Sequence, residues 1–252
     1  MKSLEKALAI LAAFTEDQKD FGVVELSEQL KMPRSQVSKI LATLRDRQFL
    51  VQDPTNRRYG VGVQSFVLGA KFLSFDRLCH EAIPQLYKLV RATGHSARLS
   101  VVSNDRAIFL VAVEGPHLQD TGWRAGRWLP WHASSAARIM LAYFDEARTS
   151  RILDGIDFVP LTPQTTRSRE ELADRIRQAR ERGYDTQNGE ISTGLCTISV
   201  PVFGACNQVV GAISLAFPHG TVSDGENASL IGALHEVARK VSVRMGNVVY
   251  GL

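Results

Sequence analysis

The segment from Val23 to Val61 constrains the fold most, because it combines two short helical patterns with a basic hairpin pattern. In residues 34–44, apolar side chains recur at intervals of three, four and seven positions: Val37, Ile40, Leu41 and Leu44. This periodicity is typical of a helix that buries one face. The opposite face of that helix must then be polar.

The polar face carries hydroxyl, amide and cationic side chains, which can reach base edges or phosphates in a DNA groove. We predict base contacts from Ser35, Gln36, Ser38 and Lys39. Two arginines of the same segment, Arg34 and Arg45, are expected to contact phosphates or the minor groove.

A second helix is predicted just upstream, where Leu26 and Leu30 lie one turn apart. Pro33 follows, and a proline both stops one helix and can open the next. The result is a helix-turn-helix.

A β-hairpin is predicted downstream. Strand-like runs at 49–52 and 57–61 flank the turn cluster Asp53-Pro54-Thr55-Asn56, and such clusters favour tight turns. Arg57 and Arg58 on the outgoing arm are expected to contact phosphates or the minor groove. Together these patterns predict a winged helix-turn-helix.

The positive charge is concentrated in this segment. Residues 31–60 hold seven Lys or Arg and two acidic residues, a local net charge of +5, whereas the whole chain carries only +4. The alternative is a solvated helical bundle whose charges keep it in solution. The predicted wing and the local concentration of positive charge together favour DNA binding.

With 252 residues the chain can form two ordinary domains. No apolar run is long enough to span a bilayer and the first residues lack a signal-peptide core, so a cytoplasmic location is expected. The three cysteines, Cys79, Cys196 and Cys206, lack CxxC spacing and predict reduced thiols. We predict neither a metal nor a cofactor.

The expected domain boundaries are 1–62 for the winged unit, 63–76 for a linker helix and 77–252 for a second domain. Residues 64–75 are apolar on more than one side. This suits a connecting helix that also packs against a partner subunit. An ordinary buried helix explains the pattern equally well.

The second half of the chain shows two predicted hairpins, at 97–103 with 107–113 and at 197–203 with 208–217. Capping boxes begin at Ser168 and Ser223, and each predicts the start of a helix. We expect the first of these helices to end at Gly183. The predicted fold class is therefore α+β, with a mixed sheet flanked by helices.

One face of two predicted strands is small and partly hydroxylic. Ala212, Ser214 and Ala216 alternate with bulky apolar residues, and so do Thr197 and Ser199. Such a face can line a ligand cavity, or it can simply let a helix pack closely.

A helix predicted to begin near Ser134 completes this cavity. Its first free N–H groups, at Ser135, Ala136 and Ala137, would suit a carboxylate. A small organic acid is therefore a plausible ligand. His132, just before the helix, is expected to be a hydrogen-bonded structural residue more often than a ligand group.

All three tryptophans, Trp123, Trp128 and Trp131, fall in the segment just before this helix. They can form an apolar wall around a ligand, and we select Trp123 as an effector contact. Core packing or a subunit contact is the alternative use for at least one of them. The tryptophans favour an aromatic acid over a very small keto acid.

Over essentially its full length the chain resembles the IclR family of bacterial transcriptional regulators. The matching blocks are Gly126, Leu129-Pro130, His132-Ala133, Arg182-Gly183-Tyr184, Glu190, Gly194-Leu195, Pro201-Val202-Phe203 and Val209 to Ser214. The resemblance implies a GAF-like effector domain for small organic or aromatic acids, and dimers or dimers of dimers on palindromic operators.

Carried over by position, the resemblance implies effector contacts from Ser135, Ala136, Gln187, Thr197, Ser214 and Ala216. The chain departs from the family pattern at several places. Ala137-Arg138 stands where Gly-Lys is usual, Gln187 and Asn188 replace commonly acidic residues, and Thr197 replaces a frequent cysteine. We therefore expect a ligand-responsive, sequence-specific DNA-binding regulator whose second domain binds a small organic acid.

Two other classes of protein are weighed against this expectation. An enzyme would use Cys196 as nucleophile, His132 as base and Glu190 as orienting acid, but no spacing enforces that geometry. A zinc-stabilised domain would use Cys79 and His80, although adjacent residues rarely bind one tetrahedral ion. An enzyme also has no need of the basic winged segment.

Overall fold

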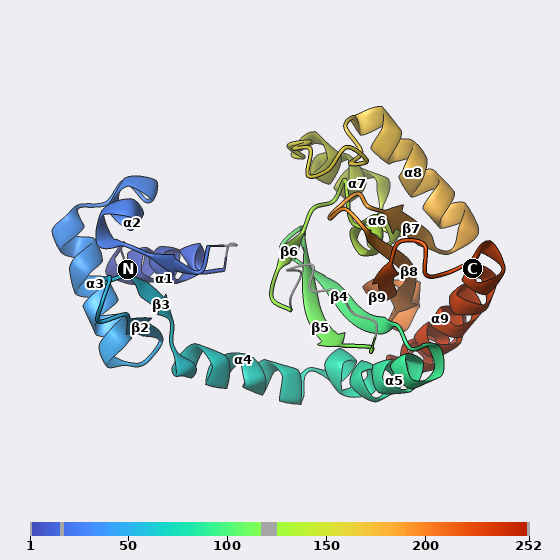
Figure 1. Ribbon diagram of the computed structural model, residues 1–252, viewed down its shortest axis with the longest axis horizontal. Helices are drawn as coiled ribbons and strands as arrows, with labels where there is room; N and C mark the ends of the chain where they lie inside the picture. The colour runs from blue at the N-terminus through green and yellow to red at the C-terminus, as the bar shows by residue number, and fades with distance from the viewer. Residues whose placement is uncertain (1, 16–17, 117–124, 251–252) are drawn as a thin grey trace. The chain divides into compact units, whose positions relative to one another are not determined.

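The computed structural model describes residues 2–15, 18–116 and 125–250 (Figure 1). The chain divides into two compact units, Met1–Asp76 and Arg77–Leu252, and each has its own apolar core. Within the described ranges, no helix combines the length and apolar character needed to cross a membrane.

The first unit contains a three-helix core, made of α1 (Lys2–Ala13), α2 (Val23–Gln29) and α3 (Arg34–Asp46). Helix α3 buries Val37 and Leu41 completely and Ile40 and Leu44 partly. The predicted apolar face of this helix is therefore confirmed. The core also takes Ile10 from α1 and Leu26 from α2.

The predicted wing forms from β2 (Leu50–Gln52) and β3 (Tyr59–Val61), which pair antiparallel. A third strand, β1 (Asp20–Phe21), pairs with β3, so the sheet order is β1-β3-β2. Its two residues are too few to show strand periodicity in the sequence. Strand β3 begins at Tyr59 rather than at Arg57, because Arg57 adopts a φ of 61° in the turn.

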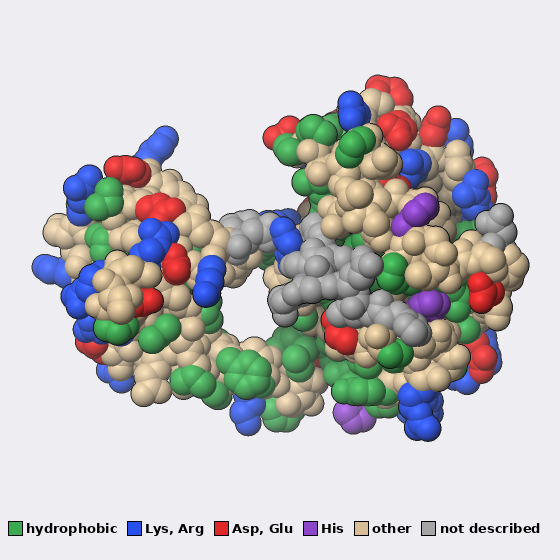
Figure 2. All heavy atoms as spheres, viewed as in Figure 1, with side chains coloured by type: hydrophobic (Ala, Val, Ile, Leu, Met, Phe, Trp, Pro, Cys, Tyr) green, Lys and Arg blue, Asp and Glu red, His purple; other side chains and the backbone are tan. Residues whose placement is uncertain are grey.

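Helix α4 (Val63–Phe75) follows the wing, lies within the 63–76 range expected for a linker helix, and falls within the first unit. None of its residues is buried. Figure 2 shows hydrophobic side chains along its surface. The exposed apolar residues are Val63, Phe66, Val67, Leu68, Phe72, Leu73 and Phe75.

The second unit is built on a six-stranded sheet with the order β6-β5-β4-β9-β8-β7. Its strands are β4 (Ser96–Ser103), β5 (Arg106–Val113), β6 (Trp128–Leu129), β7 (Asp185–Asn188), β8 (Leu195–Phe203) and β9 (Val209–Pro218). Every neighbouring pair is antiparallel. The expectation of a mixed sheet was wrong, because the central pairing of β4 with β9 is antiparallel like the two hairpins.

Helices cover both faces of this sheet (Figure 1). One face packs against α5 (Arg77–Thr93) and α9 (Asp224–Arg244), and the other supports α6 (Ser135–Leu141), α7 (Glu146–Asp154) and α8 (Arg169–Arg182). Ile213 and Leu215 belong to the first core, whereas Ala212 belongs to the second. The predicted division into a bulky face and a small-residue face is confirmed.

The helix ends follow the predicted caps. Ser168 Oγ accepts the Glu171 N–H at 3.1 Å, and α8 ends at Gly183 with a left-handed φ of 74°. Ser223 and Glu226 form the reciprocal capping box of α9. A short 3₁₀ turn, η1 (Ala205–Asn207), joins β8 to β9.

Candidate functional site

The outer face of α3 presents most of the residues selected for DNA contact. Arg34, Ser35, Ser38, Lys39 and Arg45 are exposed. Gln36 is half-buried, and its Oε1 accepts a hydrogen bond from Lys6 Nζ of α1 at 2.7 Å. Lys6 therefore occupies one acceptor position of the Gln36 carbonyl oxygen.

Two of the α3 arginines lie beside acidic groups. Arg45 Nη2 is 2.8 Å from Asp46 Oδ1, and this hydrogen bond raises the pKa of Arg45. Arg34 Nη2 lies 3.7 Å from Glu28 Oε1. Both guanidinium groups remain largely exposed, so solvent and phosphates can reach them.

The two wing arginines differ in their surroundings. Within the described part of the chain, the exposed Arg57 side chain contacts no polar partner. Arg58 is half-buried: Nη2 donates to Glu25 Oε2 at 2.8 Å and Nε donates to the Asp20 carboxylate. The hydrogen bond to Asp20 contributes most to raising the pKa of Arg58, and the bond to Glu25 raises it further. Arg58 thus ties the wing to β1 and α2.

In the second unit, four hydroxyl groups form a continuous cluster, which we call the hydroxyl cluster: Ser135, Thr197, Ser199 and Ser214. Ser135 Oγ on α6 lies 2.6 Å from Thr197 Oγ1 and 2.7 Å from Ser199 Oγ. Ser199 Oγ lies 2.8 Å from Ser214 Oγ. The structure therefore brings together three of the predicted effector residues, Ser135, Thr197 and Ser214, from three separate elements.

The hydroxyl cluster borders a small cavity of about 30 Å³ between α6 and the sheet. A cavity of this size holds only one or two water molecules. Its lining residues are Arg98, Ser100, Phe109, Leu129, Ser134, Ser135, Ala136, Gln187, Ile191, Leu195, Thr197 and Ser214. Predicted Ala136 and Gln187 are among them, whereas Ala216 is buried beside Thr197 in the sheet register but outside this lining.

The tryptophans do not line this cavity where the structure describes them. The Arg106 guanidinium lies 4.0 Å from the Trp128 ring centroid, and Trp131 Nε1 donates to Asp105 O at 3.3 Å. Trp123 lies outside the described residues. The apolar wall comes instead from residues such as Phe109 and Ile191.

The start of α6 offers fewer free donors than predicted. Ser134 Oγ accepts the Ala137 N–H at 3.3 Å, so this group is already bonded. The expectation that Ala137 offers a free N–H was wrong, because Ser134 caps the helix. His132 is structural as expected, with Nε2 located 3.0 Å from Val159 O.

Gln187 braces the loop between β7 and β8. Its Nε2 donates to Leu195 O at 3.0 Å, and its Oε1 accepts the Glu190 N–H at 2.9 Å. Both ends of the amide are thus occupied by backbone groups. Gln187 shapes the cavity wall, and a ligand would have to share these bonds.

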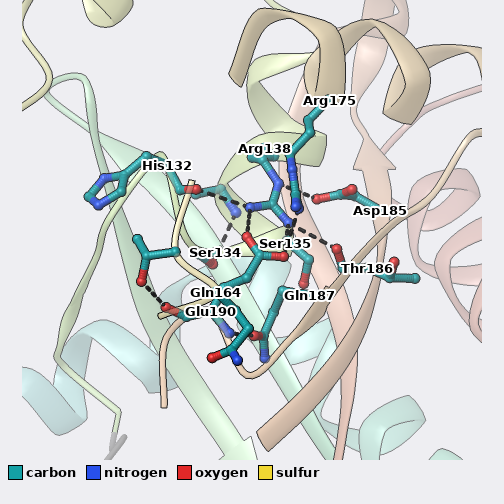
Figure 3. A network of polar contacts seen from close by, with 12 residues as sticks. His132, Ser134, Ser135, Arg138, Gln164, Arg175, Asp185, Thr186, Gln187 and Glu190 are labelled. Carbon is teal, nitrogen blue, oxygen red and sulfur yellow. Dashed lines mark hydrogen bonds and ion pairs between the residues drawn. The ribbon is translucent and has the colours of Figure 1, made fainter. Parts of the chain in front are cut away.

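A buried ionic network holds this loop against α6 (Figure 3). The fully buried Arg138 donates from Nε to Asp185 Oδ2 at 2.6 Å and from Nη1 to Glu190 Oε2 at 2.7 Å. Arg175 Nη1 donates to the other oxygen of Glu190 at 2.7 Å. Burial acts to lower the pKa of Arg138, but the charges of Asp185 and Glu190 outweigh it and raise that pKa.

Comparison with known proteins decides the family. Residues 70–243 match the model of the bacterial transcriptional regulator IclR C-terminal domain, and residues 3–54 match that of the IclR helix-turn-helix domain. The chain belongs to the IclR family of bacterial transcriptional regulators. The HTH-type transcriptional regulator KdgR of Escherichia coli K12 is 29% identical over 246 residues, which cover 98% of this chain and 93% of KdgR.

Solved structures of other family members share the fold. An IclR transcriptional regulator from Alicyclobacillus acidocaldarius is 27% identical, with a TM-score of 0.85 over 98% of this chain and 99% of that one. An IclR homologue from Microbacterium hydrocarbonoxydans, solved in complex with 4-hydroxybenzoate, is 19% identical with a TM-score of 0.80, over 97% and 99% of the two chains. At that lower identity the likeness concerns the fold alone.

This IclR-family protein is a DNA-binding transcriptional regulator and not an enzyme, because its relatives are transcriptional regulators. The three groups of the enzyme alternative are also engaged elsewhere. Cys196 Sγ lies 3.2 Å from Asn188 Oδ1 and 3.7 Å from His219 Nδ1, and burial raises the pKa of this thiol. A raised pKa opposes formation of the nucleophilic thiolate.

The zinc alternative finds no support in its two proposed ligands. Cys79 is fully buried in the core and His80 is exposed on α5. Among the residues that the structure describes, no group of three or more His, Cys, Asp or Glu side chains could hold a metal ion.

Two polar residues that line the regulator's cavity, Arg98 and Ser100, were not among the predicted site residues. Both lie on β4, where they alternate with the core residues Ala97 and Leu99. The available signal was the single charged residue inside this predicted strand, because an arginine is rarely buried without a partner.

Proposed function

We propose that this protein is a ligand-responsive, sequence-specific DNA-binding regulator whose second unit binds a small organic acid. The observation that carries the proposal is the exposed polar face of α3 beside the wing. The buried residues Val37 and Leu41 hold the helix on its core, so that Ser35, Ser38 and Lys39 point outward. A helix presented in this way can enter a major groove.

Phosphate contacts complete the proposed interface. Arg34, Arg45 and Arg57 are exposed around α3 and the wing and would supply the salt-sensitive part of the affinity. Gln36 would contribute to base reading. Arg58 would touch DNA only through whatever part of its guanidinium Asp20 and Glu25 leave free.

The hydroxyl cluster supports the effector half of the proposal. Hydroxyl groups beside apolar walls are the usual composition of a small-molecule site. The 4-hydroxybenzoate bound by the Microbacterium homologue supports an acid as the ligand class. The small cavity and the positions of Trp128 and Trp131 do not favour an aromatic ring, so an aromatic acid would require the cavity walls to separate.

We further propose that the protein acts in the cytoplasm as a homodimer or a dimer of dimers. The apolar surface of α4 supports this assembly, because large exposed apolar patches commonly mark subunit interfaces. A two-fold assembly reads a palindromic operator. The acid would change DNA affinity by favouring one spacing of the two α3 helices over another.

Selection of bound duplexes from a random pool tests the DNA half of this proposal. We expect an inverted repeat whose half-sites are spaced for two α3 helices. Light scattering on the same preparation is expected to give two or four times 27.8 kDa. A monomeric mass, or a selected pool without an enriched sequence, would contradict the proposal.

A further inference from the structure

The cavity contains a buried cation that has no ion-pair partner among the described residues. Arg98 lies on the central strand β4 and is only 8% exposed. Within the described residues, its guanidinium makes no hydrogen bond or ion pair, and its Nε is buried without a partner. An unpaired buried charge is costly, and proteins almost always satisfy such groups.

Arg138 in the same unit shows how this fold satisfies a buried arginine. Its guanidinium reaches Asp185, Glu190 and two backbone carbonyl oxygens, those of His132 and Thr186. In the part of the chain that the structure describes, Arg98 has no comparable partners. The exposed Glu114 acts on its charge without forming an ion pair with it, and burial lowers the pKa of Arg98.

The sheet register places Arg98 beside the hydroxyl cluster. Arg98 on β4 lies opposite Ser214 on β9, and Ser214 lies opposite Ser199 on β8. The Phe109 ring lies on another side of the guanidinium, with its centroid 4.9 Å from Arg98 Cζ. The cavity of about 30 Å³ is smaller than a small organic acid, so an acid would have to widen it on binding. Once bound, it would meet a cation and hydroxyl groups at one place, with an aromatic ring beside them.

We propose that Arg98 is the anchor that binds the carboxylate of the effector, and that the effector is a monocarboxylate. This inference rests on the proposed function and assigns the charge-recognising group of its cavity. An arginine binds a carboxylate through two parallel hydrogen bonds. Since Arg98 is the one cationic side chain in the described lining, a second carboxylate would find no partner.

Thermal unfolding with a panel of acids tests this anchor on the full chain. The probes are lactate, pyruvate, benzoate and 4-hydroxybenzoate, with lactamide and benzamide as uncharged analogues and succinate as the dicarboxylate. At a concentration about 100 times Kd, a bound acid should raise Tm by roughly 5 °C or more. We expect at least one monocarboxylate to do so, and neither the amides nor succinate.

The decisive variant is Arg98→Met, which removes the charge but keeps an unbranched side chain. We expect it to abolish the response to the acid and to leave the Tm of the ligand-free protein unchanged or higher. Arg98→Lys should respond more weakly than the wild type, because a lysine cannot form the paired bonds. The matched control is Arg148→Met, which removes an arginine that also stacks on a ring, that of Phe144, outside the cavity lining. This control should respond like the wild type.

The outcomes separate the anchor from the proposed function. An equal acid response in the wild type and Arg98→Met would overturn the anchor and leave an acid-binding regulator intact. Stabilisation by the amides or by succinate would overturn the carboxylate or the monocarboxylate assignment. If no acid stabilises the wild type, both the acid effector and its anchor fail. If the wild type does not bind DNA, the proposed DNA-binding function fails, whereas the acid anchor is unaffected.

Discussion

Arg138 and Glu190 are joined by a 2.7 Å hydrogen bond between Nη1 and Oε2, although neither side chain is more than 4% exposed. Arg138 belongs to α6, which carries Ser135 of the hydroxyl cluster. Glu190 lies in the loop whose backbone also bonds Gln187. The ion pair therefore joins two walls of the cavity, α6 and the loop after β7.

Removing Arg138 should destabilise the second unit strongly. Arg138→Met leaves Asp185 and Glu190 buried without their main partner, and losing one member of a buried pair costs about 3–5 kcal/mol. Chemical denaturation measures this change. The control is Arg177→Met, which breaks an exposed pair with Asp174 and should change stability by no more than about 0.5 kcal/mol. Equal losses for the two variants would contradict a stabilising role of the network.

Gln36→Ala should relax the operator preference. If Gln36 forms paired hydrogen bonds with a base, its loss reduces discrimination at that position by about 1–3 kcal/mol. Competition between matched and mismatched duplexes gives this value. Lys6→Met is the control, because it frees Gln36 from its bond to Lys6 and should keep the preference. An unchanged operator preference in Gln36→Ala would exclude Gln36 from the residues that contact bases.

Substitution of the two wing arginines should affect two different properties, the DNA affinity for Arg57 and the stability of the first unit for Arg58. Arg57→Ala is expected to reduce the slope of log K against log salt by about 1, with no change in thermal stability. Arg58→Ala should lower the stability of the first unit, because Asp20 and Glu25 lose their shared partner. Salt titrations and thermal unfolding of both variants check this. Identical behaviour of the two would show that the bonds made by Arg58 have no structural effect.

The second unit should lose stability as the pH falls below neutrality. His235 is half-buried, and burial lowers its pKa. Its stabilising contribution is complete above the pKa of an unfolded histidine, about 6.5, and is lost as the pH falls through the lower folded-state value. His235→Gln should therefore flatten the pH dependence of unfolding in this window. The exposed His80→Gln serves as control, and parallel profiles for His235→Gln and the wild type would refute the assignment.

Local patterns in the sequence predicted the elements that depend on neighbouring residues. The buried face of α3, the turn at Asp53 and the cap at Ser168 follow from spacing alone. The pairing of β1 with β3 and the antiparallel match of β4 with β9 involve residues far apart in the chain, so periodicity could not specify them. The same limit applies to the register that places Arg98 opposite Ser214.

In the candidate site, too, local spacing predicted some residues, whereas the roles of others depend on contacts between distant parts of the chain. Alternation along the strands correctly placed Thr197 and Ser214 on one face, and the predicted helix start supplied Ser135. The roles of Gln187 and Arg138 depend on loop contacts with Leu195 and Glu190, which no spacing predicts. The prediction that tryptophans line the cavity was wrong for Trp128 and Trp131. Their partners Arg106 and Asp105 lie in the β4–β5 hairpin and not in the cavity.

The winged unit should bind DNA, and an acid in the second unit should control this binding. Fluorescence anisotropy with the fragment upstream of the protein's own gene, titrated with salt in the presence and absence of the stabilising acid, tests it most directly. Log K is expected to fall linearly with log salt, and the acid is expected to shift the whole line. Binding that is insensitive to salt and unchanged by the acid would contradict both expectations.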